Sequence, residues 1–224
     1  MTLLKSLVIL GAGGFARETL DVVDAINAIS LKWDVLGFIV NSEYGLPGTV
    51  VNNKPILGDF SWLQQRPEVY IVCGVGAPEI RQRMILQLSQ SSRFATLIHP
   101  SAVLTRWMKI GDGTIITAGC ILSNQITLGQ HVHLNPDCTI GHDVVLENFV
   151  SLAPGVHVSG NVHVEEGSYI GTGANIIEKK TIGAWSIVGA GSTVVKNVPA
   201  NTTVVGIPAQ VIKERSVGWH LHES

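Results

Sequence analysis

The sequence predicts two structural units, a small parallel α/β sheet and, after it, a β-helix of hexapeptide repeats. From Ile98 to Val194 every sixth residue is aliphatic. A period of six fits neither an α-helix nor a single strand, but it is typical of hexapeptide solenoids. Before the repeat, short aliphatic runs alternate with amphipathic segments, the pattern of strand–helix–strand units. The repeated residues are Ile98, Leu104, Ile110, Ile116, Leu122, Leu128, Leu134, Ile140, Leu146, Leu152, Val158, Val164, Ile170, Ile176, Ile182, Val188 and Val194.

In the predicted solenoid, one aliphatic residue per hexapeptide points inward. Three hexapeptides complete one coil, so residues eighteen apart stack about 4.8 Å from each other. Glycine often follows the aliphatic residue directly, as at Gly111, Gly129 and Gly141, where we expect corners with backbone angles that favour glycine. Because no coil can bury its own inner face, the stability must come from stacking of neighbouring coils.

The region before the repeat reads as a small α/β unit. We expect strands over residues 7–10, 35–40 and 69–73, and helices over 17–28, 59–65 and 78–90. The predicted organisation is therefore a Rossmann-like α/β domain over 1–97, a β-helix domain over 98–213 and a C-terminal tail over 214–224. The segment from Pro199 to Lys213 is expected to close the last coil.

Composition excludes several classes of protein. The net charge of −2 gives no electrostatic basis for binding nucleic acid or an anionic membrane surface. No apolar run approaches the roughly 18 residues of a membrane span, and the run at 7–10 is too short for a signal peptide. We therefore expect a cytoplasmic protein. In that compartment Cys120 and Cys138, which should be neighbours in successive coils, are expected to stay reduced.

The first predicted strand runs into a glycine-rich turn, Gly11-Ala12-Gly13-Gly14, that precedes a helix. Backbone N–H groups at a helix N-terminus attract phosphate, and the spacing also resembles a dinucleotide fingerprint. That fingerprint expects an acidic residue at the end of the second strand, where this chain has Val40 and Asn41. The residues therefore disfavour NAD binding; nucleotide-sugar binding is what the family resemblance described below implies, and simple strand–helix packing remains open.

His142 is the candidate for catalysis. It follows the inward-facing Ile140 by two positions and should lie at a corner of the solenoid, with Asp143 beside it to orient the ring. A histidine of near-neutral pKa suits removal of a proton from an amine or hydroxyl; a merely solvated corner histidine is the alternative. The outward-facing His133, His157 and His163 do not stack on one another, so we expect no metal site within one chain.

Several motifs together resemble the PglD/NeuD-type sugar O/N-acyltransferases over essentially the whole chain. They are the glycine turn, Gly74-Val75-Gly76 with Arg81, Leu97-Ile98-His99-Pro100-Ser101-Ala102, Gly141-His142-Asp143 and Gly206-Ile207-Pro208-Ala209. The resemblance implies a left-handed β-helix, a homotrimer with its groove between neighbouring subunits, and acetyl transfer from acetyl-CoA. The implied acceptor is the amine of a nucleotide-linked amino sugar, for example a UDP- or GDP-4-amino-4,6-dideoxy sugar, or a sialic acid or other sugar hydroxyl.

The resemblance also implies roles for single residues. His142 would be the general base and Asp143 its orienting partner. The sequence departs from the family at Phe15, Asn41 and Ser151, where relatives often have histidine, an acidic residue and histidine. The implied sugar-binding residues are Gly11, Gly13, Gly14, Phe15 and Asn41, and the implied acetyl-CoA-binding residues are Ser151, Gly160, Thr172, Ala190 and Lys213.

Two alternatives from other functional classes remain. One is a zinc enzyme of the carbonic-anhydrase type, which would need histidines that converge between subunits. The other is a non-catalytic scaffold that binds a nucleotide sugar without turning over the coenzyme.

Overall fold

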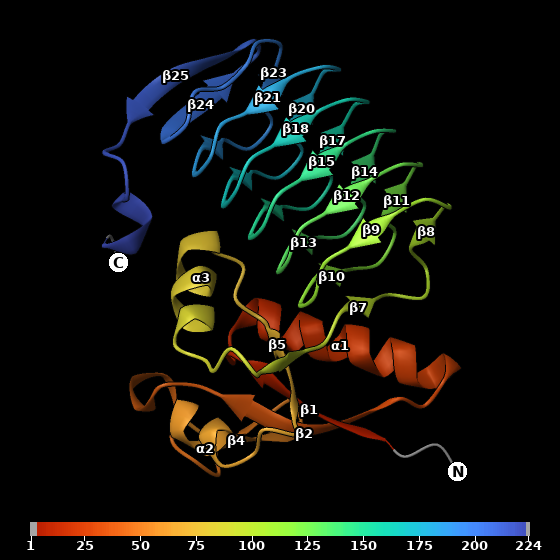
Figure 1. Cartoon of the computed structure of the whole chain (residues 1–224), viewed down its shortest axis with the longest axis vertical. Coiled ribbons are helices and arrows are strands. Elements are labelled where there is room, and N and C mark those ends of the chain that lie inside the picture. The colour runs from red at the N-terminus through yellow and green to blue at the C-terminus, as the bar shows by residue number, and fades with distance from the viewer. Residues whose placement is uncertain (1–3, 223–224) are drawn as a thin grey trace.

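The computed structural model describes residues 4–222 and shows two packed units, a sheet with its helices and a solenoid above it (Figure 1). The sheet has the strand order β3-β4-β2-β1-β5-β6. Its central strands β2, β1 and β5 are parallel, as predicted. The strands are β1 (Lys5–Leu10), β2 (Trp33–Ile39), β3 (Val50–Val51), β4 (Lys54–Gly58), β5 (Tyr70–Cys73) and β6 (Arg93–Phe94), and the helices are α1 (Gly14–Ile29), α2 (Phe60–Gln64) and α3 (Pro78–Leu86).

The helices lie near their predicted positions, although α3 ends at Leu86 and not near residue 90. Helix α1 buries Ala16, Leu20 and Val23 and lies between the sheet and the base of the solenoid (Figure 1). Its apolar face shares one core with the outward side chains Leu97 and Ile115 of the first two coils. The contact between sheet unit and solenoid is therefore a continuous hydrophobic core.

The short strands β3, β4 and β6 were not predicted. Strands β3 and β4 form an antiparallel hairpin whose turn residues Asn52 and Asn53 both have positive φ. Asparagine tolerates this left-handed conformation in two-residue hairpin turns. Strand β4 then extends the sheet by pairing with β2 in parallel. The stretch between the predicted strand over 35–40 and the predicted helix over 59–65 thus contains an additional sheet edge.

The repeats form a left-handed parallel β-helix with three faces, which confirms the predicted fold class. Face 1 contains β7 (Leu97–Ile98), β10 (Ile115–Ile116), β13 (His133–Leu134), β16 (Ser151–Leu152), β19 (Tyr169–Ile170) and β22 (Ile187–Val188). Face 2 contains β8 (Val103–Leu104), β11 (Ile121–Leu122), β14 (Thr139–Ile140), β17 (His157–Val158), β20 (Asn175–Ile176) and β23 (Thr193–Val194). Face 3 contains β9 (Lys109–Ile110), β12 (Thr127–Leu128), β15 (Val145–Leu146), β18 (His163–Val164) and β21 (Thr181–Ile182).

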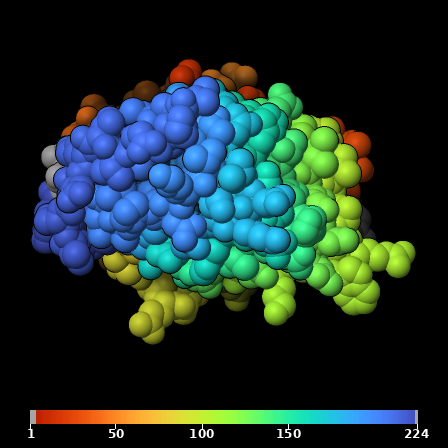
Figure 2. All heavy atoms as spheres, turned by 90° about the horizontal axis from the view of Figure 1, so that it is seen from above, coloured from red at the N-terminus to blue at the C-terminus, as the bar shows by residue number. Residues whose placement is uncertain are grey.

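The predicted register of the repeat is confirmed. Strands pair with partners eighteen residues away, so Ile116, Leu134 and Leu152 lie in one line. The repeated aliphatic residues from Ile116 to Val194 are buried, while the earlier members of the series are half-buried in the first coils. Seen from above, successive coils run as adjoining bands across the molecule (Figure 2).

The glycines that follow the inward aliphatic residues have a different role from the expected one. At Gly111, Gly129 and Gly141 φ is not positive; a Cβ there would lie 2.4–2.6 Å from atoms of the next coil. These positions need glycine because adjacent coils approach closely. The left-handed residues come two positions later, for example His131 and Asp143.

The C-terminal segment closes the solenoid as predicted. Strand β24 (Thr202–Gly206) pairs in parallel with β22, and β25 (Ala209–Glu214) returns antiparallel to it. A 3-10 turn at Trp219–Leu221 then packs near α3, where the ring of His220 stacks 3.7 Å from that of Trp185.

The three cysteines are free and buried. Within residues 4–222, no helix combines the length and apolar character needed to cross a membrane.

Candidate active site

His142 lies at the corner between β14 and β15, where face 2 meets face 3. Its Nδ1 is 2.7 Å from Oδ2 of Asp143, and their side chains are 58% and 42% exposed. With Nδ1–H donating to the carboxylate, Nε2 is the nitrogen that can accept a proton. The corner therefore holds an imidazole that the neighbouring carboxylate orients, at the position that the six-residue count predicts.

The backbone at this corner is held from both sides. The Asp143 N–H donates to the carbonyl of Asn124 in the preceding coil, and the Asn161 N–H donates to the carbonyl of His142. Gly160, one coil further, lies directly against the ring: a Cβ at this position would be 2.6 Å from Nε2 of His142. The imidazole of His142 thus packs against the backbone of Gly160, where there is no side chain.

A cleft of about 610 Å³ opens at the carboxyl ends of β1, β2 and β5. This edge is where open parallel sheets usually bind ligands. Of the predicted sugar-binding residues, Gly11, Gly13 and Asn41 line the cleft. Gly14 is the first residue of α1, whereas Phe15 packs its ring 4.8 Å from that of His133 in the solenoid. The structure brings three of the five together and places Phe15 between the two units.

Most of the cleft wall consists of side chains that sequence reasoning missed. Tyr44 comes from the turn after β2, while Val51 and Ile56 come from the hairpin β3–β4, and α3 contributes Met84 and the cationic Arg83. The wall is largely apolar, with the glycine turn at one end. The one sequence signal for the hairpin, Asn-Asn between short apolar runs, lies in a stretch that otherwise reads as a loop.

The predicted coenzyme-binding residues occupy different places. Thr172 and Ala190 lie one coil apart, exposed, at the corner between face 1 and face 2. Gly160 lies at the opposite border of face 2, and Lys213 is exposed on β25. Ser151 does not belong to an open groove. It is 1% exposed, and its hydroxyl donates to the carbonyl of Gly76.

The cleft and His142 lie on different sides of the chain. Helix α3, which lines the cleft, covers face 1: its Arg81 donates to Ser151 of β16. His142 is at the corner between the other two faces, opposite face 1. In Figure 1, α3 accordingly lies below the left end of the solenoid, whereas β14 lies along the upper right side of the solenoid.

The three histidines considered as metal ligands each contact a different partner. The His133 side chain points out of the solenoid, as predicted, but is buried beneath α3. His157 is 2.7 Å from the hydroxyl of Thr139, and His163 is 2.7 Å from a carboxylate oxygen of Glu147. Within the described part of the chain, no three side chains of His, Cys, Asp or Glu are grouped to hold a metal ion.

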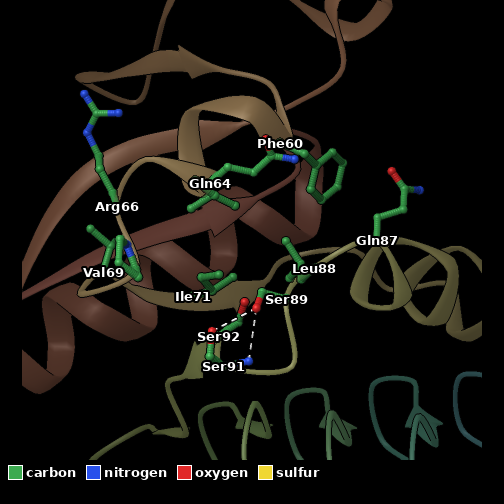
Figure 3. A pocket seen from close by; sticks show the side chains of 12 residues that line it. Phe60, Gln64, Arg66, Val69, Ile71, Gln87, Leu88, Ser89, Ser91 and Ser92 are labelled. Atoms are coloured by element: carbon green, nitrogen blue, oxygen red, sulfur yellow. Dashed lines mark hydrogen bonds between the residues drawn. The ribbon is translucent and has the colours of Figure 1, made fainter.

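A second, smaller pocket of about 350 Å³ lies between α2 and the end of α3 (Figure 3). Phe60, Val69 and Ile71 form apolar walls, and Ser91 and Ser92 lie near its rim. No predicted site residue lines this pocket.

Comparison with known proteins gives a consistent result. The PglD N-terminal domain model matches residues 6–88. The acetyltransferase domain of PglB from Neisseria gonorrhoeae is 30% identical, with a TM-score of 0.84 over 93% of this chain and 100% of that one. WeeI from Acinetobacter baumannii is 29% identical, with a TM-score of 0.83 and the same coverage. None of the curated protein sequences compared matches significantly.

A third similar structure contains ligands. It is a histidine-to-asparagine mutant of perosamine N-acetyltransferase from Caulobacter crescentus, in complex with CoA and GDP-perosamine. It is 26% identical, with a TM-score of 0.86 over 95% of this chain and 99% of that one.

Proposed function

Because the chain belongs to the PglD/NeuD-type family of sugar acetyltransferases, we propose that it transfers an acetyl group from acetyl-CoA to the amine of a nucleotide-linked amino sugar. The observation that carries the proposal is the His142–Asp143 pair, an oriented imidazole at an exposed corner. The bound ligands of the Caulobacter crescentus enzyme, CoA and GDP-perosamine, support both substrate classes.

The proposed reaction is direct transfer. The sugar amine attacks the thioester carbonyl carbon, and Nε2 of His142 takes the proton that the amine loses. The C–N bond forms, the C–S bond breaks, and the departing CoA thiolate receives a proton to give the thiol. Asp143 holds the ring and stabilises its protonated form, as expected for a carboxylate on Nδ1. A backbone N–H of the coil is suited to stabilise the oxyanion of the tetrahedral intermediate.

The nucleotide sugar is assigned to the cleft of the sheet unit, residues 1–97. The glycine turn stands at the N-terminus of α1, where the helix dipole and free N–H groups favour a pyrophosphate. The nucleobase fits the apolar wall formed by Val51 and Ile56. Asn41 lines the same cleft and can offer both a donor and an acceptor.

Acetyl-CoA is assigned to the solenoid, residues 98–213. The small exposed residues Thr172 and Ala190 border face 2, so an extended pantetheine arm can approach the coil backbone there. Lys213 is the candidate for a coenzyme phosphate. This arm would reach the corner of His142 along face 2.

The complete site is proposed to form between chains of a homotrimer. In one chain the cleft and His142 lie on different sides of the solenoid. A cleft from one chain facing the corner of the next would bring the sugar amine to His142. Sedimentation of the purified protein tests the trimer directly.

The function is tested by a substrate screen. UDP- and GDP-linked 4-amino-4,6-dideoxy sugars and free sialic acid are incubated with acetyl-CoA, and thiol release is followed. We expect release with at least one nucleotide amino sugar, unaffected by a chelator. Release with sialic acid alone would point to O-acetylation. Nucleotide binding without thiol release would point to a scaffold, and chelator-sensitive activity to a zinc enzyme.

A further inference from the structure

The position of the His142 ring depends on a residue in the next coil. An ideal Cβ built on Gly160 would lie 2.6 Å from Nε2 and 2.7 Å from Cε1 of His142. Cβ atoms essentially never approach other heavy atoms this closely. The absence of a side chain at position 160 is therefore what allows the imidazole to occupy its observed place.

The backbone around Gly160 has little room to move away. The Asn161 N–H donates to the His142 carbonyl at 2.8 Å, and the Lys179 N–H donates to the Gly160 carbonyl at 3.1 Å. On the other side Gly141 packs closely, since a Cβ there would lie 2.5 Å from the Gly160 nitrogen. The His142 side chain, in contrast, is more than half exposed. A side chain added at position 160 would clash with the imidazole, and displacement of the ring would relieve that clash.

We infer that Gly160 is a positioning residue for the imidazole, and that it sets the place of Nε2 rather than the affinity for coenzyme. The inference rests on the proposed role of His142 as general base. Asp143 engages Nδ1 of the ring, and Gly160 leaves free the space beside Nε2 and Cε1 that a Cβ would occupy. The two together fix the direction in which Nε2 presents its lone pair.

The test is Gly160→Ala, measured in the full-length protein with the nucleotide amino sugar that the screen identifies. Because the clash falls on an exposed side chain, G160A should fold with a melting temperature close to the wild-type value. We expect kcat to fall by about 10–100-fold, as misplacement of a reacting group by about 1 Å can cost 10²-fold. The KM for acetyl-CoA should stay within about twofold of the wild-type value, because the substitution is expected to move the ring and not to change coenzyme binding.

A double-mutant cycle separates positioning from other roles. If Gly160 acts through the ring, adding G160A to His142→Ala should cause no further loss of kcat. The second readout needs no turnover: NMR of the histidine ring nitrogens, with His142 assigned by its absence in H142A, should show changed Nδ1 and Nε2 signals in G160A.

Three outcomes would overturn the inference. They are wild-type kcat in G160A, an undiminished loss of kcat when G160A is added to H142A, or a raised KM for acetyl-CoA with unchanged kcat. Near-normal activity of H142A is a different result, since it would reject the general base itself. An inactive H142A beside a fully active G160A would reject only the role of Gly160.

Discussion

Nη1 of Arg81 lies 3.0 Å from Nδ1 of His133, and both side chains are fully buried between the sheet unit and the solenoid. A guanidinium can only donate, so this nitrogen of His133 is the acceptor and its proton resides on Nε2. Burial and the nearby Arg81 charge hold the pKa of His133 well below its usual range. The same guanidinium donates to carbonyls of Val75, Gly76 and Phe149. Arg81 therefore fastens the turn after β5 to the solenoid.

Arg81→Lys is expected to destabilise the contact between the two units. Lysine keeps the charge but has only three donors and a different geometry, so buried carbonyls lose their partners. We expect a loss of roughly 2–4 kcal/mol in the free energy of unfolding. Urea denaturation measures it, with the exposed Arg17→Lys as control. A variant as stable as wild type would mean that the carbonyls find other donors.

His142→Ala is expected to lower kcat by about 10²–10⁴-fold, the usual contribution of general base catalysis. Coenzyme binding, measured by calorimetry, should be largely unchanged because the ring is not needed for the coenzyme arm on face 2. Asp143→Asn should cost less, since Asp143 orients the ring and does not itself move the proton. Near-normal kcat in H142A at pH 7 would reject the mechanism.

Gly13→Val is expected to affect only the sugar substrate. A Cβ at Gly13 meets no protein atom within 4 Å, so the chain tolerates a side chain there, but the side chain takes space in the cleft. The KM for the nucleotide sugar should rise by about tenfold, on the order of 1.4 kcal/mol, with unchanged acetyl-CoA affinity. If both substrates weaken equally, the assignment of one substrate to each unit is incorrect.

His131→Phe is expected to reduce the loss of stability in acid. Burial, with the nearby Arg81 charge, lowers the pKa of His131 from 6.5 to about 4 in the folded protein. Between these values the unfolded chain binds a proton that the folded chain does not. Stability therefore falls as the pH drops through this window and is unaffected above it.

Phenylalanine suits this position because Phe149 has the same left-handed backbone one coil further and stacks on His131. H131F should be more stable than wild type by about 2 kcal/mol at pH 5 relative to pH 7.5. Part of the loss of stability in acid will remain, because the pKa of His133 is also lowered in the folded protein. The measurement is urea denaturation at the two pH values. A wild-type pH dependence in H131F would mean that His131 does not contribute.

The solenoid and its register can be predicted from residue spacing alone, because the inward position recurs every six residues and any slip would expose Leu134 or its equivalents. It also placed His142 at a corner beside Asp143, since both positions follow from the same count. The glycine turn could be assigned to a cleft because Gly11 and Gly13 follow a buried strand. These are local regularities, and a local pattern is visible in the chain itself.

The contact between the two units could not be predicted from residue spacing and is seen first in the three-dimensional arrangement. Ser151 and His133 occupy outward positions of the repeat, yet both are buried because Arg81 of α3 inserts its guanidinium there. The requirement for glycine at position 160 likewise arises from a contact with the ring of His142, eighteen residues away in the sequence. The hairpin β3–β4 forms because β2 offers an open sheet edge. Such contacts depend on which surfaces come together in space. Residue spacing along the chain does not show which surfaces these are.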